Sequence, residues 1–159
     1  MISIVKCQVF VYAGEAVKEL SFMPRRNSLQ SKIENRIAQS GDAVFLTREF
    51  ADLGGERQVL RALAKTVDAG KLIRLGYGIY GRAEPSRLTG QPILAADQGF
   101  AGAARAALNK LGVAWEPGQW EQAYNEGRTT QVPVNAVLRV KGRFARHLAY
   151  RGKPLVLER

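Results

Sequence analysis

The stretch from Ala43 to Ala83, AVFLTREFADLGGERQVLRALAKTVDAGKLIRLGYGIYGRA, restricts the fold of this chain more than any other. It opens on Val44-Phe45-Leu46, a short apolar run that suits a buried strand. A short helix is predicted next, Gly54-Gly55 supplies a turn, and Glu56 to Ala69 then has helical spacing. Two strand-like runs follow, one on each side of Gly76-Tyr77-Gly78. The stretch therefore predicts strand, helix, turn, helix and hairpin, in that order.

The predicted helix at Glu56 to Ala69 separates its apolar side chains from its polar ones. Residues three and four positions apart share one face of a helix. The apolar face holds Val59, Leu60, Leu63 and Val67, and the polar face holds Arg57, Gln58, Arg61 and Lys65. We expect the first face to enter a core and the second to meet an anion.

Another helix is predicted before this stretch, because Leu29, Ile33 and Ile37 recur every four residues. Ser31 followed by Glu34 fits a capping box for its first turn. The complete order of helix, strand, helix, turn, helix and hairpin is the plan of a winged helix-turn-helix, a fold that usually binds duplex DNA.

Tyr77 lies at the tip of the predicted hairpin, which would be the wing. The glycines on both sides of it favour a tight loop. Its ring would either point outward or pack across the two strands, and the sequence leaves both readings open.

The second half of the chain has weaker signals. Prolines and glycines favour a connector at 85–99, and Phe100 to Leu111 has the pattern of a helix. A loop from Trp115, a short helix at Gln119 to Asn125 and a small antiparallel sheet from Val132 onward complete the prediction. We therefore expect an α+β chain, with a winged helix-turn-helix at 28–84, a connector at 85–99 and a small α+β domain with antiparallel strands at 100–159.

Residues 1–27 form an N-terminal extension with poor alternation of apolar and polar residues. One interpretation is an edge strand at Ser3 to Tyr12. We favour the other, in which Met23 is the natural start and the first 22 residues are a loose tail or a misassigned extension.

The net charge of +10 is concentrated in two blocks. Residues 54–90 contain seven Lys and Arg against three acids, and residues 128–159 contain eight against one. Residues 91–127 between them contain two basic residues and four acids. Such a distribution is typical of a surface that attracts a polyanion.

Enzyme and metal chemistry are poorly supported. With one cysteine (Cys7) and one histidine (His147), the chain excludes an internal disulfide and a site with several histidines. Asp97, Glu116 and Glu121 could converge as a metal site, but their spacing does not require it. No apolar run approaches the roughly 20 residues that span a bilayer. We expect a soluble cytoplasmic protein without cofactor or metal that is not an enzyme.

On the DNA-binding model, the exposed face of the second helix reads the major groove. Arginine and glutamine can bond purine edges with two hydrogen bonds, and lysine can neutralise phosphate. Arg57, Gln58 and Arg61 are then the candidates for base contact, Lys65 lies nearer the backbone, and Arg74, Tyr77 and Arg82 belong to the wing. Phosphate contacts set position and affinity rather than sequence preference.

The C-terminal block RVKGRFARHLAYRGK forms a second candidate basic surface with interleaved aromatic residues. Its basic residues are Arg139, Lys141, Arg143, Arg146, Arg151 and Lys153. They would extend a nucleic-acid footprint or contact an acidic protein partner, and the sequence does not decide between these.

Two segments resemble the AbiEi-like antitoxin and transcriptional-regulator family of bacteria and mobile elements. These are AVFLTREFADLGGERQVLRALAKTVDAGKLIRLGYGIY and AYNEGRTTQVPVNAVLRVKGRFARHLAYRGK. The resemblance covers roughly Ser31 to the C-terminus, and it includes Gln131-Val-Pro. It implies an N-terminal winged helix-turn-helix on operator DNA and a C-terminal domain that supports repression or antitoxin activity. Such antitoxins are paired with a nucleotidyltransferase-like toxin in the type IV class.

The sequence thus predicts a DNA-binding transcriptional regulator, an antitoxin-like autorepressor whose partners are double-stranded DNA and a nucleotidyltransferase-like toxin encoded nearby. A homodimer is compatible with it. The alternative is a protein-interaction module that neutralises a toxin, or binds an acidic partner, without specific DNA readout.

Overall fold

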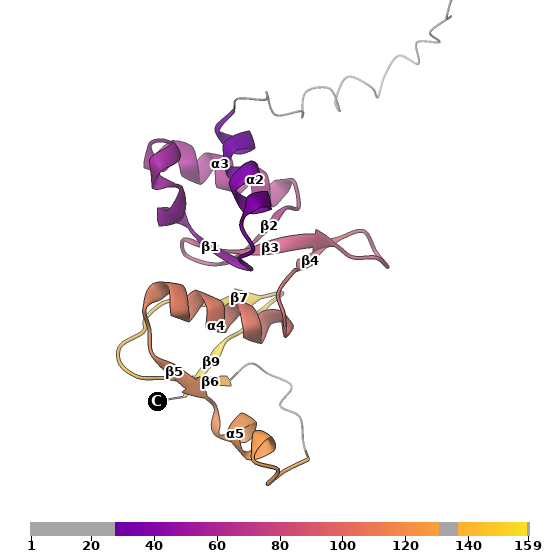
Figure 1. Ribbon diagram of the computed structural model, residues 1–159, viewed down its shortest axis with the longest axis vertical. Helices are drawn as coiled ribbons and strands as arrows, with labels where there is room; N and C mark the ends of the chain where they lie inside the picture. Colours follow the sequence, from indigo (N-terminus) through magenta and orange to yellow (C-terminus); the bar gives the residue numbers. More distant parts are fainter. Residues whose placement is uncertain (1–27, 131–136, 159) are drawn as a thin grey trace, which may run out of the picture.

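The structure is a computed structural model that describes residues 28–130 and 137–158 (Figure 1). In these ranges the chain is of the α+β class, with five helices and several small, mostly antiparallel sheets. The predicted N-terminal extension, including both interpretations of its first 22 residues, lies outside the described residues, as does Gln131-Val-Pro.

The first described helix, α2 (Leu29–Gln39), begins one turn earlier than the capping box predicts. Ser28 is its N-cap, and the Ser28 hydroxyl accepts a hydrogen bond from the backbone N–H of Ser31 at 3.2 Å. Glu34 instead pairs with Lys71, with 2.6 Å between carboxylate and ammonium. The earlier serine caps the helix because the apolar face of α2 already begins at Leu29, which packs against the core.

Strand β1 (Val44–Leu46) continues directly into η2 (Thr47–Leu53), which is a 3-10 helix. The Glu49 carboxylate accepts the backbone N–H of Leu46 at 2.7 Å and so satisfies a donor at the start of η2. Gly54 and Gly55 form the predicted turn, and α3 (Glu56–Asp68) begins immediately after Gly55.

The buried face of α3 differs from the predicted one at Leu60. Val59, Ala62, Leu63 and Thr66 are buried, whereas Leu60 is 40% exposed. Thr66 is tolerated in the core because its hydroxyl donates to the Ala62 carbonyl at 2.8 Å. The small Ala62 and the bonded Thr66 turn the contact face away from Leu60, so the assignment of Leu60 to the core is wrong.

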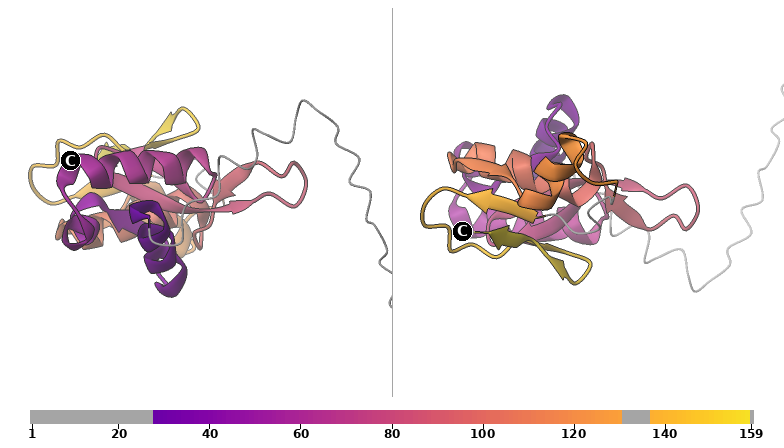
Figure 2. Two further views of the ribbon diagram at one scale, coloured as in Figure 1. Left: turned by 90° about the horizontal axis from the view of Figure 1, so that it is seen from above. Right: turned by 90° about the horizontal axis from the view of Figure 1, so that it is seen from below.

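A tight hairpin follows α3. Strands β2 (Leu72–Gly76) and β3 (Ile79–Pro85) are antiparallel, and Gly78 has the left-handed φ of 69° that their turn requires. β1 pairs with the other edge of β3, which gives the strand order β1-β3-β2. The segment predicted as a connector contains β4 (Pro92–Leu94), which pairs with the far end of β3 and forms a second, projecting hairpin (Figure 2).

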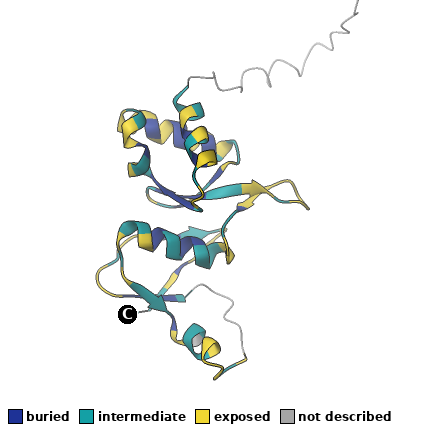
Figure 3. Ribbon diagram, in the orientation of Figure 1, coloured by how far each residue is buried: buried dark blue, intermediate teal, exposed yellow. Residues whose placement is uncertain are grey.

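This sheet is covered on both faces. On one face, Phe45, Leu72 and Tyr80 pack with α2, η2 and α3. On the other, residues such as Leu46, Leu75 and Ile79 share a core with α4 (Gly99–Leu111). Parts of α3, of the sheet and of α4 are dark in Figure 3, and the sheet lies between these two helices. The second core therefore crosses the predicted connector and unites the two halves of the chain.

The C-terminal strands only partly follow the prediction. Short strands lie at β5 (Trp115–Pro117), β6 (Val137–Val140), β7 (Ala149–Tyr150), β8 (Lys153–Pro154) and β9 (Val156–Glu158), and α5 spans Gln119–Asn125 as predicted. β6 pairs antiparallel with β5, which lies in a predicted loop, but parallel with β9. Parallel pairing is possible because the β7–β8 hairpin lies in the crossover between β6 and β9.

In the two described ranges, no helix combines the length and apolar character needed to cross a membrane.

Candidate nucleic-acid interface

The outward stripe of α3 carries the predicted basic residues. Arg57, Gln58, Arg61 and Lys65 are all exposed. Across residues 28–130 and 137–158, none of these four side chains has an ion pair or a hydrogen bond. An unpaired guanidinium in water keeps all its donors available to a ligand, so this stripe can bind anions.

The four side chains do not share one position around α3. Arg57 and Arg61, one turn apart, lie opposite the buried face. Gln58 lies over the preceding turn, since a Cβ placed on Gly54 would be 3.4 Å from the Gln58 side-chain oxygen. Lys65, seven positions after Gln58, shares that edge. The opposite edge carries Leu60 and faces the β2–β3 hairpin.

The β2–β3 hairpin brings two further predicted residues beside α3. Arg74 is exposed on β2, opposite Tyr80 of β3, whose ring is buried in the core shared with α2, η2 and α3. Tyr77 is 78% exposed at the turn, so its ring does not pack across the strands. Arg74, Tyr77 and Leu60 line one pocket, and the structure therefore brings the hairpin and α3 together.

Arg82 lies apart from this group. Its guanidinium donates hydrogen bonds to the carbonyl oxygens of Ile37 and Ser40 at the end of α2. It also lies 6.0 Å from the centre of the Phe45 ring. Both bonds come from Nη2 and hold the guanidinium against the end of α2, so Arg82 acts within the fold.

The second predicted basic surface is dispersed. Arg139 is half-buried in β6, and Lys141 pairs with Glu116 at its carboxylate, which lowers the pKa of Glu116. The guanidinium of Arg151 lies 5.5 Å from the Tyr150 ring centre. Arg143, Arg146 and Lys153 are exposed, and of the six only Arg146 reaches the pocket beside Tyr77.

The three carboxylates considered for a metal site are not gathered. Glu116 pairs with Lys141 and Glu121 with Arg105, while Asp97 lies by the end of β4. Within the described ranges, no group of three or more His, Cys, Asp or Glu side chains could hold a metal ion.

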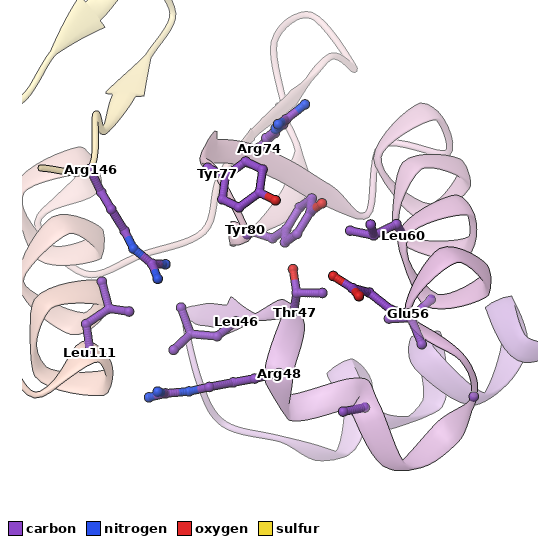
Figure 4. Close-up of a pocket in the computed structure, with 14 residues that line it drawn as sticks. Leu46, Thr47, Arg48, Glu56, Leu60, Arg74, Tyr77, Tyr80, Leu111 and Arg146 are labelled. Atoms are coloured by element: carbon purple, nitrogen blue, oxygen red, sulfur yellow. The ribbon is translucent and has the colours of Figure 1, made fainter.

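One feature that sequence reasoning missed is the pocket itself, about 430 Å³, between the first half of α3 and the β2–β3 turn (Figure 4). Arg48 of η2 and Leu111 of α4 help to line it. No sequence pattern could have found it, because its walls come from segments far apart along the chain.

This chain matches no family model, no curated protein and no solved structure.

Proposed function

We propose that this chain is a sequence-specific DNA-binding regulator of transcription, with a winged helix-turn-helix in which α3 is the recognition helix and the β2–β3 hairpin is the wing. The observation that carries the proposal is the position of Arg57 and Arg61, which have no ion-pair partner among the described residues, on the outward stripe of α3 beside the exposed Arg74 and Tyr77. A basic helix next to a basic hairpin suits a major groove with its flanking phosphates.

The proposed contacts divide by position. Arg57 and Arg61 bond guanine edges, where each good bidentate contact contributes roughly 1–3 kcal/mol of discrimination. Gln58 and Lys65, on the edge of α3 opposite Leu60, meet an adenine edge and a phosphate. Arg74 and Tyr77 contact the backbone on the hairpin side. Arg82 is left out of the proposed interface because the fold uses its guanidinium.

The regulatory role that we propose is autorepression in a bacterial cytoplasm, where occupancy of an operator blocks transcription of the protein's own operon. The resemblance to AbiEi-like antitoxins extends this to a nucleotidyltransferase-like toxin as partner. A gene for such a protein immediately downstream would favour the antitoxin form. A homodimer would place two copies of α3 on half-sites one helical turn apart.

A second candidate function is favoured by the exposed apolar side chains. Leu60 is 40% exposed and Tyr77 is 78% exposed, and Glu56 places a carboxylate beside them. A protein partner could bury this mixed surface without DNA, which is the function of an interaction module.

The deciding experiment is fluorescence anisotropy with the upstream DNA of the protein's own gene and with a scrambled duplex, titrated across salt. Purely electrostatic binding treats both duplexes alike and falls steeply with salt. We expect a preference for the upstream DNA that persists at about 0.15 M salt. Equal and salt-fragile binding would favour the interaction module.

The matched variants are R57A/R61A and R128A. We expect R57A/R61A to lower the preference for the upstream DNA over the scrambled duplex by about tenfold or more. Arg128 follows α5, at the opposite end of the molecule from α3, and is exposed and paired with Glu126 (Figure 1). R128A also replaces an exposed arginine by alanine, but far from α3, and should retain the preference for the upstream DNA. Equal effects of the two variants would contradict the role of α3.

A further inference from the structure

The pocket between α3 and the β2–β3 turn has the size of a small-molecule site. Its volume of about 430 Å³ lies within the roughly 300–1,000 Å³ typical of ligand pockets. It opens beside the proposed DNA surface but reaches under it, to Leu46 of β1 and to Tyr80 of β3.

Part of the pocket wall is apolar. Leu46 and Tyr80 are buried, and Leu60 and Tyr77 stand partly in solvent above them. In Figure 4 the rings of Tyr77 and Tyr80 lie on one side of the space, with Leu60 and Leu46 around it. An apolar body placed there would remove these side chains from water, which favours binding.

Three arginines (Arg48, Arg74 and Arg146) and one carboxylate (Glu56) line the pocket. Arg146, from the segment between β6 and β7, extends into the space on the side of Leu111, whereas the Glu56 carboxylate lies on the opposite side (Figure 4). Within residues 28–130 and 137–158, the Arg146 guanidinium has no ion pair and no hydrogen bond. The basic side is therefore ready for an anionic group.

A hydroxyl group also lacks a partner at this site. The Thr47 side-chain oxygen is buried without a hydrogen-bond partner, and Thr47 lines the pocket.

We propose that this pocket binds a small organic anion, with an aromatic or aliphatic body against Tyr77, Tyr80 and Leu60 and with its carboxylate or sulfonate on Arg146. A lone inorganic phosphate would leave these apolar side chains in water, so the organic body is part of the proposal. Because Tyr77 and Arg74 also belong to the proposed DNA interface, an occupant would compete with DNA. This regulatory consequence, unlike the binding itself, rests on the proposed function.

The test uses two fluorescent probes on the purified protein without DNA. 8-Anilinonaphthalene-1-sulfonate has an aromatic body with one sulfonate, and N-phenyl-1-naphthylamine has the same body without the charge. We expect one molecule of the sulfonate probe to bind per chain, with enhanced fluorescence. The variant R146Q should weaken it about tenfold, the loss expected for one charge-assisted hydrogen bond, and leave the uncharged probe unchanged.

Two further variants locate the probe. Ala51 is exposed and lines the pocket, so A51W should fill the space and weaken both probes. Arg151 is exposed and does not line the pocket, so R151Q should leave both unchanged. Circular dichroism checks that each variant is folded. If A51W does not fold, the comparison of R146Q with the wild type decides the test.

Three results would overturn the proposal: no fluorescence enhancement, equal binding by wild type and R146Q, or equal losses from R146Q and R151Q. Added upstream DNA that displaces the sulfonate probe would establish the competition. If the probe binds as described but DNA does not displace it, the pocket stands and its regulatory role fails. Failure of DNA binding itself is read from the anisotropy experiment, so the two proposals are judged separately.

Discussion

At the scale of the residue, Arg82 joins three elements. It extends from β3, donates to two carbonyl oxygens at the end of α2 and lies over the Phe45 ring of β1. The last carbonyls of a helix have no partner within the helix, and Arg82 supplies donors to two of them. A surface arginine thus stabilises the junction between α2 and the sheet.

We predict that R82A lowers the free energy of unfolding by about 1–3 kcal/mol, because hydrogen bonds from a charged donor are lost at a half-buried site. R61A, which removes an exposed side chain of the outward stripe of α3, should change it by no more than about 0.5 kcal/mol. Urea unfolding of both variants measures the difference. If R61A were as destabilising as R82A, the division between fold and interface would be wrong.

At the scale of the element, the β2–β3 hairpin and the C-terminal segment are in close contact. Gly76 at the end of β2 forms an isolated β-bridge with Leu148. A Cβ on Gly76 would lie 2.6 Å from the carbonyl oxygen of His147, closer than the two atoms can approach. Only glycine allows the backbones to meet here, although its φ is not left-handed.

We predict that G76A costs roughly 1–3 kcal/mol, the range for overpacking, because one of the two backbones must shift. G41A is the matched control, since a Cβ on Gly41 meets nothing within 4 Å. It should leave the melting temperature unchanged or slightly raised. Thermal denaturation followed by circular dichroism compares the two variants. Equal melting temperatures would mean that the hairpin does not need this contact.

Sequence periodicity predicts elements well where their own residues decide them. α2 and α3 follow from helical spacing, and Gly54-Gly55 and Gly78 from turn chemistry. The prediction for Leu60 is wrong because helical spacing allows two faces that both include Val59. Only the packing of α3 on the sheet selects one of them.

The site was predicted in part for the same reason. The exposed residues of α3 can be read from one helix, whereas the pocket combines Leu60 with Leu111 and Arg146. Those contacts depend on the docking of the C-terminal half, and no local pattern encodes it. The contacts of Arg82 could not be predicted either, because its hydrogen-bond acceptors lie more than forty positions earlier in the sequence.

At the scale of the whole molecule, Lys110 connects the two halves. Its ammonium, near the end of α4, bonds the carboxylates of Asp42 at 2.9 Å and Glu49 at 2.7 Å. Burial alone would lower the pKa of Lys110, but the hydrogen bonds that its ammonium donates to Glu49 and Asp42 outweigh burial and raise that pKa. The same bond to Lys110, followed by one from Ser40, lowers the pKa of Asp42 below its ordinary value of 3.8.

The lowered pKa of Asp42 gives stability a defined pH dependence. The ionised carboxylate stabilises the fold above its unfolded pKa of 3.8, and this contribution is lost as the pH falls through the lower folded value. We predict that K110M reduces the free energy of unfolding near pH 7 by about 1 kcal/mol or less, because the pair is partly exposed. It should also flatten the acid-induced loss. Urea unfolding between about pH 3 and pH 7 tests both effects, and an unchanged acid slope would contradict the assignment.

The sheet that is covered on both faces has a consequence for protein engineering. Leu46, Leu75 and Ile79 owe their burial to α4 and the C-terminal strands, not to α3, which carries the basic stripe. Residues 28–84 grafted onto another protein would bring an exposed apolar face of the sheet together with the basic stripe. The graft would need polar replacements at these positions, or a host surface shaped to cover them.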